Sequence, residues 1–135
     1  MTVAEIQHPS VRACLTYVSM PYGIEMQHNA DVPGMAGLGS SSAFTVGFLH
    51  ALYALIGRDI TKYQLARDAI HVEQNIIKEN VGSQDQTACS FGGFNKIEFG
   101  GDEQIHVTPI PMDGERLREL QKHLMLIFTR FSRNA

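Results

Sequence analysis

The sequence predicts an α+β protein, because segments with helical periodicity and segments with strand-like alternation both occur along its 135 residues. Two observations carry this prediction. The run from Ser41 to Ile56 is apolar on nearly all sides, which is typical of a helix buried inside a domain. Phe94–Phe99 and Ile105–Ile110 flank the glycine-rich stretch 100–102, as the two strands of a hairpin do.

The first half of the chain predicts three further elements. A helix is expected over Pro9–Ser19, where apolar residues recur on one face. A half-buried strand is expected over Gly23–Ala30, because apolar and polar residues alternate there. Gly57 is expected to end the long apolar helix. Thr61 is expected to cap another helix, which runs through about Ile77.

The second half predicts three more elements. A short helix is expected over Gln84–Phe91, after a break at Val81–Ser83 that ends the preceding helix. An amphipathic helix is expected over Asp113–His123, and a strongly apolar strand over Leu124–Phe131. A strand this apolar favours partners on both of its sides.

Composition limits the classes of function that the chain can have. The length is that of one domain, and the net charge of −3, without a long basic run, argues against a nucleic-acid surface. No apolar stretch reaches the length of a membrane span, and Met1–His8 lacks the features of a signal peptide. Cys14 and Cys89 show no pairing motif, so we expect reduced thiols in a cytoplasmic protein.

Pro33–Ala43, Pro-Gly-Met-Ala-Gly-Leu-Gly-Ser-Ser-Ser-Ala, is the stretch most informative about function. Its glycines allow a positive φ and a close approach of the backbone to a ligand. Its serines stand where a helix should begin, so one can cap the helix and another can offer a hydroxyl to a phosphate or a metal. The dipole at that helix start favours an anion. The stretch therefore predicts a phosphate-binding loop.

Two better-known phosphate loops are excluded by single positions. In the P-loop motif a lysine would stand at the position of Ser40. In the dinucleotide fingerprint a third glycine would stand at the position of Ser42. A glycine-serine loop that only caps a buried helix stays open as the alternative.

Two acidic residues lie in patterns that suggest chemistry. Glu73 stands on the edge of the apolar stripe of its helix, where it either reaches solvent or pairs with a metal or a ligand amine. Asp85 begins a short helix, where it either favours the helix dipole or takes part in a reaction. Phosphoryl transfer needs a phosphate loop, a magnesium ligand and a group that orients the acceptor hydroxyl, and this combination favours the reactive alternatives.

The pattern Pro33-x-x-x-Gly37-Leu-Gly-Ser-Ser-Ser-Ala43 resembles the second motif of the GHMP kinases, the superfamily of galactokinase, homoserine kinase, mevalonate kinase and phosphomevalonate kinase. Within the superfamily, the stretches Gln84–Ala88 and Phe91–Asn95 make the sequence most similar to the D-glycero-D-manno-heptose 7-phosphate kinases. Fucose- and galactose-type sugar kinases of the superfamily share much of this pattern and stay open as alternatives.

The resemblance implies a role for each motif residue. The residues that would wrap the ATP phosphates are Gly37, Leu38, Gly39, Ser40, Ser41 and Ser42. Within this loop Ser42 would lie at the edge, and Ser41 would give its hydroxyl to Mg²⁺. Glu73 would be the acidic magnesium ligand. Asp85 would be the base or orienting group for the sugar hydroxyl.

The resemblance also implies a fold, a reaction and partners. The fold would be a ribosomal protein S5 domain 2-like two-layer sandwich, and residues 1–135 would be the central part of a GHMP kinase N-terminal domain. The first strands and the C-terminal domain would be absent, so exposed sheet edges would invite self-association. ATP would phosphorylate the anomeric hydroxyl of a heptose 7-phosphate. A non-catalytic nucleotide-binding remnant and an interaction domain of the same fold stay open.

Overall fold

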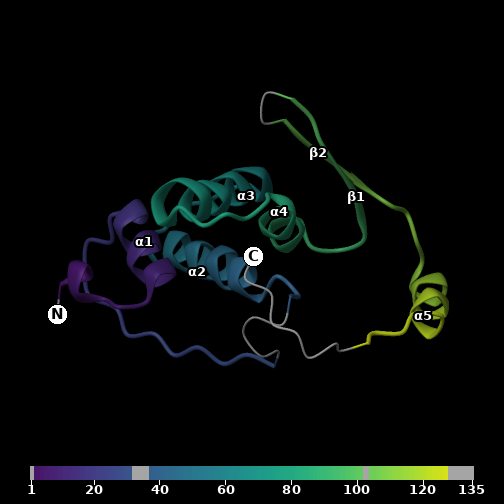
Figure 1. The fold of residues 1–135 in the computed structure, drawn as a ribbon, viewed down its shortest axis with the longest axis horizontal. Coiled ribbons are helices and arrows are strands. Elements are labelled where there is room, and N and C mark those ends of the chain that lie inside the picture. Colours follow the sequence, from purple (N-terminus) through teal and green to yellow (C-terminus); the bar gives the residue numbers. More distant parts are fainter. Residues whose placement is uncertain (1, 32–36, 102–103, 128–135) are drawn as a thin grey trace. The chain divides into compact units, whose positions relative to one another are not determined.

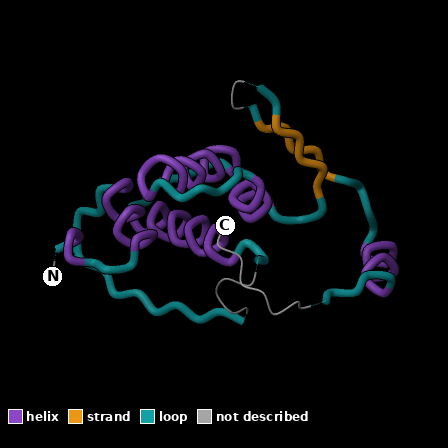
Figure 2. Tube along the Cα trace, viewed as in Figure 1, coloured by secondary structure: helices purple, strands orange, loops and turns teal. Residues whose placement is uncertain are grey.

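The computed structural model describes residues 2–31, 37–101 and 104–127 of the chain. It divides into two compact units, one formed by residues up to Phe91 and one that begins at Gly92. The first unit is built from helices, and the second contains a hairpin followed by a helix (Figure 2). Helices combined with a small antiparallel sheet confirm the α+β prediction.

The first unit is a group of helices around one apolar centre (Figure 1). Its elements are η1 (Val3–Glu5), α1 (Pro9–Val18), α2 (Ser40–Leu55), α3 (Lys62–His71), η2 (Val72–Ile77) and α4 (Gln84–Phe91). Helix α2 contacts α1, α3 and α4, so it lies at the centre of the unit. Leu49, Leu52 and Tyr53 of α2 are almost completely buried, as expected for a helix that is apolar on nearly all sides.

The helix boundaries follow the predicted signals closely. The Thr61 side chain accepts a hydrogen bond from the backbone N–H of Gln64 at 3.1 Å, so Thr61 caps α3. Gly57 has a φ of +68° directly after the last turn of α2, which confirms the expected stop. Helix α1 begins after His8, whose side chain accepts a hydrogen bond from the N–H of Val11.

The helix that starts at Lys62 changes its geometry before it ends. After His71 the turn widens into η2, a π-helix over Val72–Ile77. It ends at Lys78, which has a φ of +65° and whose N–H donates to the carbonyl of Glu73. The extent of the predicted helix is confirmed, but its last residues are π-helical. Such π-helical turns are rare in proteins, and those that do occur are often found at functional sites.

The second unit contains β1 (Asn95–Phe99), β2 (Ile105–Pro109) and α5 (Gly114–Lys122). The two strands are antiparallel, with Ile97 opposite Val107, which confirms the predicted hairpin. Helix α5 confirms the predicted amphipathic helix, and Leu117 and Leu120 on one face are half-buried.

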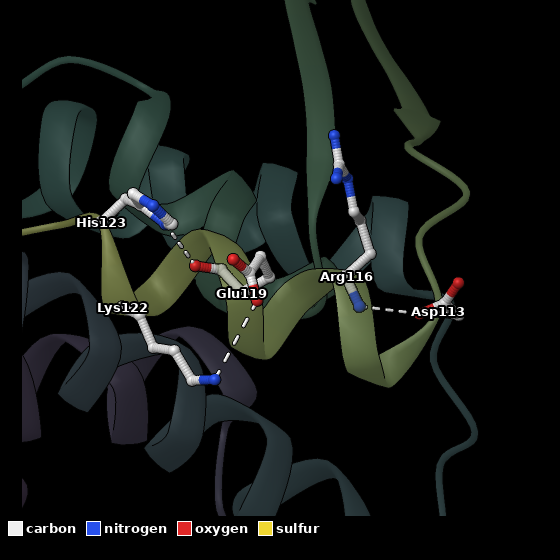
Figure 3. A network of polar contacts seen from close by, with 5 residues as sticks. All are labelled: Asp113, Arg116, Glu119, Lys122 and His123. Carbon is white, nitrogen blue, oxygen red and sulfur yellow. Dashed lines mark hydrogen bonds and ion pairs between the residues drawn. The ribbon is translucent and has the colours of Figure 1, made fainter.

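Polar contacts fix both ends of α5 (Figure 3). Asp113 Oδ1 accepts from the N–H of Arg116 at 2.7 Å and caps the first turn. At the other end, His123 Nδ1 donates to the carbonyl of Glu119 at 2.8 Å, and the Glu119 carboxylate lies 4.0 Å from Lys122 Nζ. Positive groups at a helix C-terminus also favour the helix dipole.

Two strand predictions are wrong where the structure describes them. Gly23–Ala30 forms no strand, and neither do residues 124–127, while residues 128–131 of the second predicted strand lie outside the described residues. A strand needs a neighbour to pair its N–H and C=O groups. Among the described residues the only strand pairing is that of β1 with β2. The two predicted segments therefore have no neighbouring strand with which to form hydrogen bonds, despite their alternation and hydropathy. Met125 is accordingly 85% exposed.

The first unit holds a buried carboxylate that ties three helices together. Asp68 of α3 is 3% exposed and accepts hydrogen bonds from Tyr53 of α2 at 2.6 Å, Tyr17 of α1 at 2.9 Å and Gln64 at 2.7 Å. Burial, followed by the hydrogen bond to Asp68, raises the pKa of Tyr17 to about 12. Asp68 was not predicted from the sequence, although Leu65 and Val72 place it on the apolar stripe of its helix.

We expect Asp68→Asn to lower the free energy of unfolding by about 2 kcal/mol, because hydrogen bonds to a charged group are lost or weakened. The same change removes part of what raises the pKa of Tyr17, so its absorbance titration should move to lower pH. Urea unfolding and a spectrophotometric titration measure the two effects. Asp59→Asn, at an exposed position, is the control. Equal stability of the two variants would contradict the role given to Asp68.

No helix of the part of the chain that the structure describes is long and apolar enough to cross a membrane.

Candidate functional site

The glycine-serine loop forms the N-terminal end of α2. Gly37 and Gly39 have φ values of +71° and +69°, a conformation that side chains disfavour. Gly39 is the N-cap residue, so the expectation that a serine caps the helix is wrong. A glycine has no side chain with which to bond the first N–H groups of α2. No side chain among the described residues caps these donors, which lie at the positive end of the helix dipole, where an anionic ligand is favoured.

The three serines of the loop face different surroundings. Ser41 is exposed and Ser40 is half-buried. Ser42 is 5% exposed, and its hydroxyl donates to Glu73 Oε2 at 2.9 Å. The hydroxyl that contacts Glu73 is thus that of Ser42, and Ser42 points into the protein instead of lying at the edge of the loop. Pro33, at the start of the motif, lies outside the described residues.

Glu73 lies in the π-helical turn and is 1% exposed, so it does not reach solvent. Its Oε2 atom accepts from both Ser42 and the side-chain amide of Gln86. Its Oε1 atom is buried and has no hydrogen-bond partner among the described residues. A buried polar atom left without a partner costs about 1–3 kcal/mol. Oε1 is therefore an acceptor that a cation or a donor would satisfy.

Asp85, in the first turn of α4, lies directly against the loop. A Cβ atom placed on Gly39 would come within 2.9 Å of Asp85 Cγ and 3.0 Å of Asp85 Oδ2. The approach of α4 is fixed by Gln74 of η2, whose amide donates to the carbonyl of Val81 at 3.0 Å and to the hydroxyl of Ser83 at 3.3 Å. Asp85 is exposed, so its carboxylate is accessible to a substrate.

The two acidic residues make the surroundings of the site electronegative. Burial, and next the charge of Glu73, raise the pKa of Cys14 to about 12. Burial, followed by the charges of Asp85 and Glu73, raises the pKa of Cys89. Burial and Glu73 likewise raise the pKa of Glu79. A cation bound at the site would reduce this field.

The donor set fits magnesium held together with a nucleotide. No group of three or more His, Cys, Asp or Glu side chains that could hold a metal occurs in residues 2–31, 37–101 and 104–127. Magnesium in kinase sites is typically bound by one or two carboxylates, by water and by the phosphates themselves. Oε1 of Glu73, which has no partner among the described residues and lies close to the glycine-serine loop, matches that pattern.

A groove of about 780 Å³ runs from the loop along α2. Ser40 and Ser41 line it at one end, and His8, His28 and Phe44 line it further along. The His28 ring meets Phe44 edge-on with ring centroids 5.0 Å apart, and the His8 and Phe44 centroids are 5.2 Å apart. The groove thus joins a polar end to an aromatic wall, a lining typical of small-molecule sites.

The site therefore brings together Gly39, Ser42, Glu73 and Asp85, which the sequence analysis had selected from three separate segments. Among the described residues no hydrogen bond joins Ser41 to Glu73, and the Ser41 carbonyl accepts a hydrogen bond from Thr45 Oγ1. No role for Gln86 was predicted from the sequence. Its signal was available, since it follows Asp85 directly in a stretch used for the resemblance.

Comparison with known proteins gives the context of this geometry. The family described as GHMP kinases N terminal domain matches residues 8–93. The D-glycero-alpha-D-manno-heptose 7-phosphate kinase of Campylobacter jejuni is 31% identical over 119 residues, which are 88% of this chain and 35% of that protein. The mevalonate kinase of Pyrococcus furiosus is 29% identical over 90 residues, which are 67% of this chain and 27% of that protein.

The fold is also found in a solved structure. A D-glycero-D-manno-heptose 1-phosphate kinase from Bacteroides thetaiotaomicron superposes with a TM-score of 0.69 at 28% sequence identity, over 78% of this chain and 36% of that one. The predicted similarity to heptose kinases is confirmed, and the chain spans about a third of the length of these heptose kinases. Because the match to residues 8–93 covers more than half of its length, the chain belongs to the GHMP kinases.

Proposed function

We propose that the chain is the central part of the N-terminal domain of a kinase that transfers a phosphoryl group from ATP to a hydroxyl of a sugar phosphate. Three features of the described residues carry this proposal: N–H groups at the start of α2 that no side chain caps, Oε1 of buried Glu73 without a partner, and Asp85 against Gly39. Phosphoryl transfer depends mainly on positioning and charge stabilisation, which is what these groups offer.

The loop binds the phosphates of ATP in this proposal. The backbone of Gly37, Leu38 and Gly39 and the N–H groups of the first turn of α2 surround them, and the helix dipole favours their charge. Ser40 and Ser41 add hydroxyl groups on the accessible side. The nucleoside lies in the adjoining groove, with its base along the aromatic wall at Phe44.

Glu73 provides the magnesium-binding oxygen, and Ser41 is the second ligand that the resemblance implies. When bound, the ion would neutralise charge on the phosphates as the transfer proceeds. Glu73 is suited to this role because Oε1 is held ready by two hydrogen bonds to Oε2, so little reorganisation is required.

Asp85 accepts the proton of the acceptor hydroxyl and orients that hydroxyl toward the terminal phosphate. Its position against Gly39 supports this role, because the acceptor must lie next to the phosphates. The name of the Campylobacter jejuni relative favours a heptose 7-phosphate as acceptor. The sequence resemblance implies transfer to its anomeric hydroxyl. ATP as donor and free thiols at Cys14 and Cys89 favour the cytoplasm as the compartment.

Calorimetry with a non-hydrolysable ATP analogue tests the proposal on this chain. We expect the chain to bind the analogue only when magnesium is present. Glu73→Gln should weaken this binding by at least about 10-fold, which is the lower end of the affinity loss when a group that supports a metal site is removed. Glu115→Gln, in the exposed first turn of α5, removes the same charge and is the control. Equal magnesium dependence in both variants would contradict the assignment of Glu73.

The acceptor is tested by following ADP release with heptose 7-phosphate and with mevalonate, since both kinds of kinase are among the relatives. Transfer to the heptose alone supports the proposed substrate. Nucleotide binding without transfer to either acceptor would instead favour a nucleotide-binding module that has kept the fold.

A further inference from the structure

The two oxygen atoms of the Glu73 carboxylate have opposite surroundings. Oε2 accepts from the Ser42 hydroxyl at 2.9 Å and from the Gln86 amide. Oε1 is buried and accepts from no group in the described part of the chain. One oxygen of the carboxylate therefore accepts two hydrogen bonds, and the other has no partner among the described residues. Its two donors come from α2 and α4, while Glu73 itself lies in η2.

The orientation of Gln86 is fixed by chemistry. A carboxylate oxygen of the charged form only accepts hydrogen bonds, so the amide must present its NH₂ group to Glu73. Its own carbonyl oxygen then points elsewhere, and this atom is buried and unpartnered among the described residues. Gln86 is 1% exposed, so it cannot exchange this contact for water. A buried polar side chain in such a contact locks the rotamer of its partner.

We propose that Gln86 and Ser42 are positioning residues, which hold Glu73 through Oε2 and so reserve Oε1 for the cation. This inference rests on the proposed function, in which Glu73 binds magnesium. It assigns Ser42 a task different from that of its two neighbours in the loop: Ser40 and Ser41 face the phosphates, and Ser42 faces the carboxylate. It also gives a reason for glutamine directly after Asp85.

The contact has a geometric consequence for Asp85. Gln86 is fixed on Glu73, and Asp85 precedes it in the first turn of α4. The hydrogen bond that orients the metal ligand therefore also fixes the backbone that carries the acceptor-orienting group. Groups that act together in a site of this kind must be held within about 0.5 Å of their productive positions.

The test measures Mn²⁺ binding by electron paramagnetic resonance in the presence of a non-hydrolysable ATP analogue. Gln86→Met keeps the length of the side chain and removes the donor, and Ser42→Ala removes the hydroxyl alone. We expect Gln86→Met to weaken Mn²⁺ binding by about 10-fold or more, in line with other groups that support a metal ligand. Urea unfolding of each variant should stay cooperative, which loss of folding would not allow.

Thr87→Val is the matched control, because Thr87 is also buried in α4 but donates to the carbonyl of Ser83 and not to Glu73. Circular dichroism establishes that each variant is folded. If Gln86→Met does not fold, Ser42→Ala carries the test, with a weakening of several-fold expected from the loss of one of the two donors. Mn²⁺ affinity equal to that of the unchanged chain in the folded variant overturns the inference.

A double-substitution cycle separates this inference from the proposed function. If Gln86 acts only through Glu73, adding Gln86→Met to Glu73→Gln should weaken Mn²⁺ binding no further. Additive losses would overturn the positioning role while Glu73 remains a metal ligand. If Glu73→Gln alone leaves Mn²⁺ affinity unchanged, the proposed function of Glu73 fails, and the inference fails with it.

Discussion

Asp85→Asn is expected to lower the rate of phosphoryl transfer by about 10²–10⁴-fold, the usual contribution of a group that moves a proton in the reaction. Asparagine has nearly the same size, so the approach of α4 to Gly39 should survive. It cannot take a proton from the acceptor hydroxyl. Nucleotide binding should be kept or improved, because a negative charge beside the phosphates is removed.

The outcome can be checked in two ways that do not depend on each other. Turnover is measured by ADP release, with Asp59→Asn as the exposed control. The pH dependence of alkylation at Cys89 reports the charge itself, since Asp85 is one of the causes that raise the pKa of this thiol. The pKa should fall in Asp85→Asn, so alkylation at a fixed pH below the pKa should become faster. Full turnover together with faster alkylation would exclude Asp85 as the base.

Gly39→Ala is expected to reduce transfer on the order of 10²-fold, because a misplacement of about 1 Å at a reacting group has this effect. The new Cβ would lie 2.9 Å from Asp85 Cγ, so the aspartate must move away from the loop. Alanine would also have to adopt a φ of +69°, at a cost of about 1–2 kcal/mol. Steady-state kinetics and urea unfolding measure the two effects.

Gly37→Ala separates these two causes. Gly37 has nearly the same backbone conformation, with a φ of +71°, but a Cβ there meets no atom of the described residues within 4 Å. It should therefore lose a similar amount of stability and much less activity. If both variants lose activity equally, the contact between Gly39 and Asp85 has no part in the reaction, and backbone conformation alone explains the loss.

Local signals predicted the helices and the hairpin well. Thr61, Gly57 and Asp113 act through contacts with their near neighbours, so their effect can be derived from a few residues of sequence. The apolar run of α2 predicted its central place because burial depends mainly on composition. Gly37 and Gly39 of the glycine-serine loop have the expected positive φ, while phosphate binding by this loop stays a prediction.

What sequence could not predict depends on partners far along the chain. Gly23–Ala30 has the alternation of a strand, but alternation cannot say whether a neighbouring strand is there to pair with it. The burial of Asp68 depends on tyrosines from two other helices. The contact between Ser42 and Glu73 joins residues 31 positions apart, and spacing along one helix gives no information about it. Gly39 is the N-cap because the loop needs a left-handed backbone conformation there, and this requirement outweighs the usual preference for serine.

The π-helical turn at Val72–Ile77 sets the direction in which buried Glu73 and its neighbours in the helix point. A helix advances by about 100° per residue, so gaining or losing one residue swings all later side chains by more than a quarter of a circle. In a π turn that extra residue is absorbed locally. The segment before it can keep Leu65 and Val72 in the core, while Glu73 and Gln74 face the start of α4. Deleting one residue in this turn would keep the helix, but it would rotate the Glu73 side chain away from the glycine-serine loop.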